Sequence, residues 1–299
     1  MTNSQTQNNF HTPVLLEEAV DALNVQIGQW YVDCTLGGGG HTKEIVRRGG
    51  KVLGIDQDKD SLAEARENLK EAGEVRFQKA NFSALEAIVR EENITPAGVL
   101  FDLGVSSHQL SGQGRGFSLQ VDEPLDMRMD PETQTVTARN LVNGLYEKEL
   151  EKLITTYGED PLAKRIAAAI IRTRSSKPIE TTRELADLVA EVYKKTYRKP
   201  SRIHPATRTF QALRIAVNDE INVLKEALVA SLKVLKPRGR CVVISFHGLE
   251  DKVVKTSFRV WETKTLGKTL TPKPIIPNEE EIYKNPRSRS AKLRIFEKK

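Results

Sequence analysis

The chain has 299 residues, of which 38% are hydrophobic and 29% are charged, and it has only two cysteines. This composition excludes a disordered chain, and apolar runs far shorter than about 18 residues exclude a membrane-spanning one. Residues 1–10 are polar and lack the pattern of a secretion signal, so we expect a cytoplasmic protein. Two cysteines cannot form a disulfide framework, and Cys34 and Cys241 are predicted to be buried thiols.

The net charge of +6 is small for this length, but the basic residues are concentrated in one part of the chain. Residues 164–214 contain thirteen Lys and Arg against four Asp and Glu, so the rest of the chain is slightly acidic. The tail, 284–299, adds seven Lys and Arg against one Glu. Such local basicity is typical either of a solvated surface or of a surface that binds nucleic acid phosphates.

The first hundred residues alternate short apolar runs with helical patterns, which predicts βαβ units and a parallel sheet. Helices are expected at 41–48 and 61–72. The four expected strands are Trp30–Thr35, Lys51–Ile55, Val75–Lys79 and Gly98–Phe101.

The βα alternation stops after Asp102, and a Gly- and Ser-rich stretch leads into helical periodicity from 147 to 197, which predicts a helical insertion. The α/β pattern then resumes with apolar residues every three or four positions from Leu213 to Leu235, which predicts one helix of about six turns. Buried strands are expected at 241–246 and 292–296. The polar segment between them, 263–289, is predicted to be a long loop.

Four consecutive glycines, Gly37 to Gly40, follow the first strand, and Asp56 ends the second. Glycines let the backbone approach a ligand, and a carboxylate about twenty residues on can accept hydrogen bonds from ribose hydroxyls. The run lacks the third glycine of the dinucleotide fingerprint, so S-adenosylmethionine is favoured over NAD. The alternatives are a flexible turn for the glycines and a helix cap for Asp56.

Asp102 ends the fourth strand, at the same sheet edge as the glycine run. There it could orient an exocyclic amine and accept its proton during methyl transfer. The alternative is a carboxylate that only binds a cofactor or caps a turn.

Six separated runs of the sequence, in the expected order, closely resemble the ribosomal RNA small subunit methyltransferase H family. They are HTPVLL at 11–16, DLGVSS at 102–107, RGFS at 115–118, PLDMRMD at 124–130, HPATRTFQALR at 204–214 and ISFH at 244–247.

The resemblance implies S-adenosylmethionine-dependent methylation of the N4 amine of one cytosine in the decoding region of small-subunit rRNA, by direct in-line transfer without a metal. It also implies a Rossmann-like methyltransferase sheet with an inserted helical domain. The cofactor-binding residues carried over from the family are Gly39, Gly40, His41, Asp56, Phe82, Asp102 and Gln109, with Asp102 also the catalytic candidate. Taken alone, His41 would more often be a helix-start residue than a ligand.

Two positions depart from the family pattern. His108 stands where the family usually has Pro, and Gly248 stands where it usually has Ser after Phe246 and His247. The second departure puts in doubt any catalytic role for that serine.

We therefore expect the catalytic domain in two parts, 1–110 and 213–299, around a substrate-binding insertion at 111–212. The expected partner is small-subunit rRNA or the small ribosomal subunit, with no membrane, for a monomer or homodimer. The rival hypotheses are a methyltransferase acting on DNA or protein amines, and a non-catalytic RNA-binding assembly factor.

Overall fold

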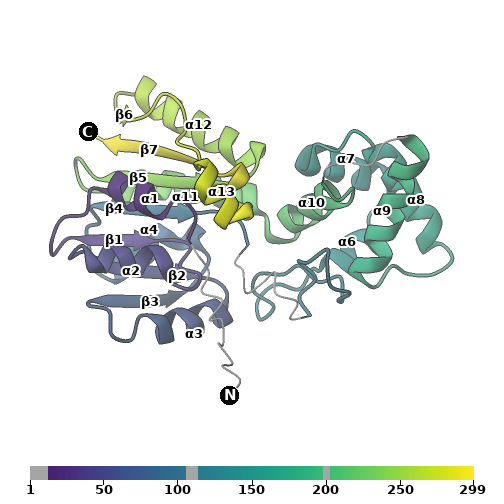
Figure 1. Ribbon diagram of the computed structural model, residues 1–299, viewed down its shortest axis with the longest axis horizontal. Coiled ribbons are helices and arrows are strands. Elements are labelled where there is room, and N and C mark those ends of the chain that lie inside the picture. The colour runs from purple at the N-terminus through teal and green to yellow at the C-terminus, as the bar shows by residue number, and fades with distance from the viewer. Residues whose placement is uncertain (1–12, 106–113, 198–202) are drawn as a thin grey trace, which may run out of the picture. The chain divides into compact units, whose positions relative to one another are not determined.

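The computed structural model describes residues 13–105, 114–197 and 203–299 (Figure 1). The chain divides into two compact units. The first combines Met1–Gly104 with Leu224–Lys299, and the second is Val105–Val223. The second unit is thus inserted into the first directly after its fourth strand.

Among the described residues, the first unit contains a sheet of seven strands in the order β3-β2-β1-β4-β5-β7-β6 (Figure 1). Neighbours among β1 to β5 are parallel, whereas β7 is antiparallel to both β5 and β6. The predicted α/β fold class and the six predicted strands are confirmed. The strands are β1 Trp30–Asp33, β2 Lys51–Asp56, β3 Val75–Lys79, β4 Gly98–Asp102, β5 Arg240–Ser245, β6 Gly267–Thr269 and β7 Lys292–Lys298.

Successive side chains of a strand point to opposite sides of the sheet, so both of its faces are apolar, and helices cover both. Val99 and Phe101 of β4 pack with α4, α11 and α12, whereas Leu100 between them packs with α1 and α2. Leu36 and α3 form a smaller cluster. The helices of this unit are α1 Leu16–Leu23, α2 Gly40–Arg47, α3 Lys59–Asn68, η1 Phe82–Ala84, α4 Leu85–Glu91, α12 Gly248–Thr263, α13 Glu279–Lys284 and η2 Pro286–Ser290. Helix α11, Glu220–Val234, begins in the second unit and belongs to the first from Leu224 on.

The second unit is helical, as the sequence predicts, and has its own hydrophobic core. Ile166, Ile170 and Leu185, three of the apolar positions of the helical pattern, are fully buried in it. Met127 and Met129 of the preceding segment complete the same core. Its helices are α6 Ala138–Gly144, α7 Glu147–Gly158, α8 Ala163–Arg174, α9 Thr182–Thr196 and α10 Thr207–Asn218.

The prediction of one long helix from Leu213 to Leu235 is wrong, because the chain breaks between α10 and α11. Asp219 adopts the left-handed conformation, with φ 48° and ψ 35°, which Asp tolerates better than most residues. Arg214 and Glu220 pair across the break with two contacts of 2.8 Å. The apolar spacing continues through the break, so periodicity alone does not reveal it.

The prediction of a long loop at 263–289 is also wrong. This segment contains β6, which pairs with β7 at the sheet edge, and then α13 and η2. Ile275 adds an isolated antiparallel bridge to Leu293. The segment is therefore fixed to the C-terminal strand by backbone hydrogen bonds.

Both cysteines are buried free thiols, as predicted. Burial raises the pKa of both Cys34 and Cys241, the latter to about 12. In the part of the chain that the structure describes, no helix is both long and apolar enough to cross a membrane.

Replacing Asn218, the residue before the break at Asp219, is predicted to lower the stability of the protein strongly. The buried Asn218 side chain accepts from the Met129 amide and donates to the Met127 carbonyl, each at 2.8 Å. Asn218→Ala leaves these backbone groups unpaired, so we expect a loss of about 2–4 kcal/mol in the free energy of unfolding. Asn222→Ala, at an exposed position of α11, is the control and should cost less than about 1 kcal/mol. Equal losses in urea denaturation would contradict this interpretation.

Candidate active site

Three neighbouring parallel strands of the first unit each end on an aspartate. Asp33 ends β1, Asp56 ends β2 and Asp102 ends β4. Because β1 pairs in parallel with both other strands, all three carboxylates lie at one edge of the sheet. In open α/β sheets this edge is where ligands bind. Asp33 is absent from the sequence prediction, because the predicted first strand continues to Thr35 whereas β1 ends at Asp33.

Asp56 is held in place by backbone amides. Its Oδ2 accepts from Gly37 N and its Oδ1 from Asp58 N, both at 2.9 Å. Burial raises the pKa of Asp56 to about 6, against the lowering effect of these hydrogen bonds. The carboxylate thus joins the glycine loop to the end of β2.

The glycine loop is packed closely against the rest of its own unit. Gly39 has a φ of 83°, and a Cβ there would lie 2.7 Å from a Leu69 methyl carbon. A Cβ on Gly40 would lie only 2.2 Å from Pro13 Cγ. The loop therefore needs glycine for its own packing, and its backbone conformation is fixed.

His41, at the start of α2, lies between the N-terminal segment and Asp102. Its Nε2 lies 3.1 Å from the Val14 carbonyl oxygen, and because a carbonyl only accepts, this nitrogen carries the proton. The opposite nitrogen, Nδ1, lies 3.7 Å from Asp102 Oδ2. His41 is 5% exposed, so this position belongs to the interior of the site.

Asp102 has an unusual environment. Its amide donates to Thr35 Oγ1 at 2.6 Å, while its Oδ1 is buried and has no hydrogen-bond partner among the described residues. Burial raises its pKa well above the ordinary value, and the negative charges of Asp33 and Glu250 raise it further. A buried carboxylate oxygen without a partner is costly in the free protein and suits a ligand that brings a cation or a donor.

Asp33 lies behind Asp102 and is more deeply enclosed. It accepts from the Thr42 hydroxyl at 2.8 Å and from the Thr35 amide at 3.2 Å. Burial raises its pKa to about 6.

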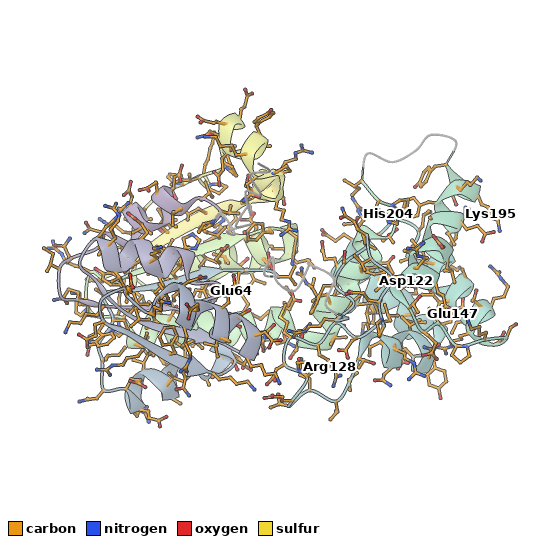
Figure 2. All side chains as sticks on the ribbon, turned by 60° about the horizontal axis from the view of Figure 1, so that its bottom comes forward. Glu64, Asp122, Arg128, Glu147, Lys195 and His204 are labelled. Carbon is orange, nitrogen blue, oxygen red and sulfur yellow. The ribbon has the colours of Figure 1, made fainter. Side chains whose placement is uncertain are left out.

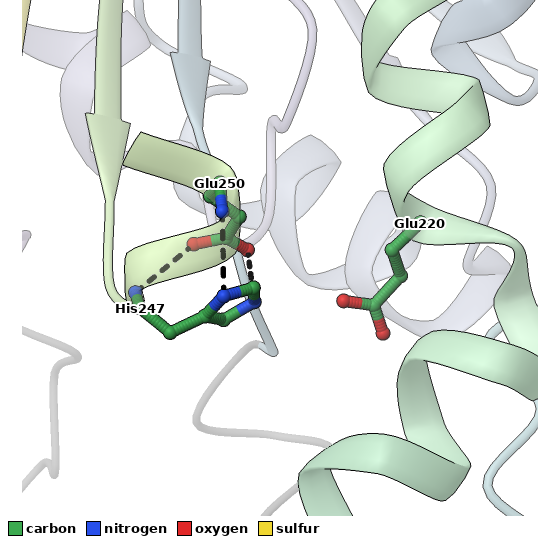
Figure 3. Close-up of side chains that lie close together, drawn as sticks. All are labelled: Glu220, His247 and Glu250. Atoms are coloured by element: carbon green, nitrogen blue, oxygen red, sulfur yellow. Dashed lines mark hydrogen bonds and ion pairs between the residues drawn. The ribbon is translucent and has the colours of Figure 1, made fainter. Parts of the chain in front are cut away.

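His247 and Glu250 lie after β5, the next strand beyond β4, and form the first turn of α12 (Figure 3). Glu250 accepts from the Phe246 amide at 2.8 Å, and its amide donates to His247 Nδ1 at 3.4 Å. His247 Nε2, which therefore carries the ring proton, lies 3.1 Å from Glu250 Oε1. Gly248, the departure from the family pattern, begins α12 beside this pair. Glu220, also drawn, belongs to the helical unit.

Of the remaining residues that the sequence analysis singled out, the structure describes Phe82 but not Gln109 or His108. Phe82 follows β3 and packs edge-on against Phe101, with ring centroids 5.7 Å apart. This contact fixes the orientation of the Phe82 ring. Gln109 and His108 lie outside the described residues.

A sequence model of the MraW methylase family matches residues 8–299. The chain belongs to this family. The family that the six sequence motifs predicted is thereby confirmed, and with it the expectation of a methyltransferase.

Curated relatives share nearly the whole length of this methyltransferase. The ribosomal RNA small subunit methyltransferase H of Carboxydothermus hydrogenoformans is 46% identical, over 96% of this chain and 97% of its own. The protein of the same name from Brevibacillus brevis is 44% identical, over 96% and 98%. A solved structure of SMU.1697c from Streptococcus mutans in complex with SAH aligns with 97% of this chain and 99% of its own, at 12% identity and a TM-score of 0.44.

Some basic residues of the helical unit pair with acids, whereas others are exposed. Lys177 pairs with Glu184 at 2.7 Å, and Lys195, labelled in Figure 2, pairs with Glu191 at 2.5 Å. Arg208 is exposed and donates to the Glu159 carbonyl. Arg198, Lys199 and Arg202 lie outside the described residues.

The burial of Asp33 predicts a pH-dependent stability effect. Its folded pKa of about 6 lies above the ordinary 3.8, so folding favours the protonated form, and stability falls as pH rises from about 4 through 6. Asp33→Asn removes this loss. We expect the free energy of unfolding to rise by up to about 3 kcal/mol at pH 7.5 and to change little at pH 4. Destabilisation by the same amount at both pH values in urea melts would contradict the assigned cause.

Proposed function

We propose that this chain methylates the N4 amine of a specific cytosine in the decoding region of small-subunit rRNA, in the cytoplasm. The observation that carries the proposal is the set of buried carboxylates at the sheet edge, beside a fixed glycine loop, in a chain of the MraW methylase family. The relatives described above are named for methylation of small-subunit rRNA.

The residues at this edge fit S-adenosylmethionine. Asp56 is placed to accept from ribose hydroxyls, and the glycine loop beside it is held in one backbone conformation by Leu69 and Pro13. The Phe82 ring can flank the adenine, and Asp102 is kept as a cofactor contact from the family pattern. We also propose Gln109 as a cofactor contact, from the family pattern alone. When bound, this cofactor supplies an electrophilic methyl group on a sulfonium, which an amine nitrogen attacks as the carbon–sulfur bond breaks.

Asp102 is the residue proposed to act on the amine. An exocyclic amine is a poor nucleophile because its lone pair is delocalised into the ring, so it must be oriented and must lose a proton. Asp102 Oδ1 accepts that proton, and a raised pKa makes it a better proton acceptor once it is ionised. The Nδ1 atom of His41 lies 3.7 Å from the other carboxyl oxygen, Oδ2, which is beyond hydrogen-bond distance.

The helical insertion is proposed to bind the RNA, with residues 111–212 as the substrate-binding domain. The exposed cations of α8, α9 and α10, such as Arg172, Lys194 and Arg208, can neutralise phosphates. The target cytosine must leave its stack to reach a catalytic edge of this kind. Direct in-line transfer of this type requires no metal ion.

Labelled methyl transfer tests the proposal. The chain is incubated with labelled S-adenosylmethionine and small-subunit rRNA, either naked or assembled, and the modified base is mapped. Methyl label on N4 of one decoding-region cytosine supports the proposal. Label on DNA or protein amines, or no transfer to either RNA substrate, would overturn it.

Asp56→Ala should weaken cofactor binding about 100-fold or more, because two charge-assisted hydrogen bonds to the ribose are lost. Calorimetric titration measures the affinity, and thermal melting checks that the fold persists. Glu67→Ala, which removes an exposed carboxylate from α3, is the matched control and should bind normally. Undiminished affinity of Asp56→Ala would refute the ribose contact.

Asp102→Ala should lower kcat by about 100-fold or more while changing cofactor affinity much less. The physical reason is that proton acceptance matters only as the nitrogen–carbon bond forms. Single-turnover kinetics and cofactor titration of the same preparation provide the two values. Equal losses would reduce Asp102 to a cofactor-binding residue.

A further inference from the structure

The inner side of helix α12 is held firmly against the sheet by apolar packing. Val254, Phe258 and Trp261, which lie on one side of the helix, are buried in the core of the first unit. The Phe258 and Trp261 ring centroids are 5.3 Å apart, and Trp261 lies edge-on to Phe296 of β7 at 5.0 Å. Because this packing covers the apolar side of α12, it also determines which residues face outward.

The outer side of α12 carries a row of exposed basic residues. Lys252, Lys255 and Arg259 are spaced three and four positions apart, so they lie on the same side of the helix, over about 10 Å of its axis. Together with Lys264, they line a surface hollow of about 440 Å³. Among the described residues, no acid lines this hollow.

These four cations are not neutralised by ion pairs within the described part of the chain. Exposed lysines on other helices of the same unit are neutralised: Lys233 pairs with Glu86 at 2.7 Å, and Lys284 pairs with Glu280 at 2.6 Å. The row on α12 is therefore different from the paired charges that are common on this surface.

The acids of α12 do not cancel this charge. Glu250 is buried at the start of the helix, and Asp251 pairs with Lys292 and Arg294 of β7 at 3.2 and 2.6 Å. Glu262 is the exposed acid of the helix. Four exposed cations against this one exposed acid give the outer surface of residues 252–264 a net charge of +3.

The row of cations begins near the candidate active site. Helix α12 starts at Gly248, three residues after the end of β5 at Ser245. Because β5 pairs in parallel with β4, this start lies at the same edge of the sheet as Asp102. Lys252 is in the second turn of the helix, and the row runs from there along the outside of the unit, away from that edge.

We propose that this surface, defined as Lys252, Lys255, Arg259 and Lys264, binds the phosphates of the rRNA strand that flanks the methylated nucleotide. A linear row of unpaired cations is the complement of a chain of phosphates, and it binds them without regard to base sequence. This inference rests on the proposed function and adds a contact from the catalytic unit itself to those of the helical insertion.

RNA is favoured over the other polyanions that such a row could meet. A helix that binds a membrane surface places its apolar side in the lipid, whereas the apolar side of α12 is buried against the sheet. An acidic protein would have no reason to lie at the catalytic edge, where the proposed function requires the RNA strand to enter.

The test uses the full chain and a single-stranded fragment of small-subunit rRNA that contains the decoding region. A triple variant, Lys252→Gln with Lys255→Gln and Arg259→Gln, should weaken RNA binding about 10-fold or more at low salt in fluorescence anisotropy. The slope of log affinity against log salt should become shallower by about 2, because each lost phosphate contact removes about 0.7. The KM for RNA should rise, whereas kcat and cofactor affinity should stay unchanged.

The matched control removes the same charge from exposed positions elsewhere in the unit. A second triple variant, Lys70→Gln with Arg90→Gln and Arg238→Gln, should keep nearly the RNA affinity and salt slope of the unmodified chain. Equal losses in both triple variants would show that only net charge matters and would overturn the inference.

Two further results would also contradict it. One is unchanged RNA affinity of the α12 variant. The other is a defect seen only with assembled subunits, which would assign the surface to a ribosomal protein. Absence of methyl transfer by the unmodified chain would instead count against the proposed function.

Discussion

The burial of several carboxylates at one edge of a parallel sheet is the constraint on which the site depends. Asp33, Asp56 and Asp102 end adjacent strands, and Glu250 adds a fourth negative group after β5. Burial raises the pKa values of all three aspartates, and the negative charge of Asp33 raises those of Asp56 and Asp102 further. A cationic ligand with donor groups stabilises the ionised form of such carboxylates, and this interaction favours its binding.

The surrounding structure keeps this edge in place through short-range hydrogen bonds and close backbone packing. Thr35 and Thr42 bond to the ends of the strands, and the glycine loop is closed by Pro13 and Leu69. The N-terminal segment then connects the loop to α13 through Leu15. Parts of the chain that are distant in sequence therefore contact one another in one small region. A substitution at Pro13 or Glu281 should alter the position of the cofactor loop.

The strands and the acids Asp56 and Asp102 at their ends could be predicted from the sequence, because buried strands and their terminal acids are local features. The expectations for His41, Phe82 and Gln109 came from the family resemblance instead. Asp33 was missed because the apolar pattern of the first strand was read as far as Thr35, two residues beyond the end of β1. The break at Asp219 could not be predicted, since it depends on Asn218 bonding to the distant Met127 and Met129. The structure of 263–289 was missed because its polar composition is typical of loops, whereas its order comes from pairing with β7, which no local pattern reveals.

The central claim, that buried carboxylates must ionise to receive the cofactor, is tested most directly by proton release on binding. Calorimetric titration of S-adenosylmethionine at pH 6, in two buffers with different heats of ionisation, measures the number of protons exchanged. Burial raises the pKa of Asp33 and Asp56 to about 6 and that of Asp102 well above its ordinary value, so these groups are partly protonated in the free protein at pH 6, and net proton release on binding is expected. Binding without proton release at pH 6, or with proton uptake, would contradict it.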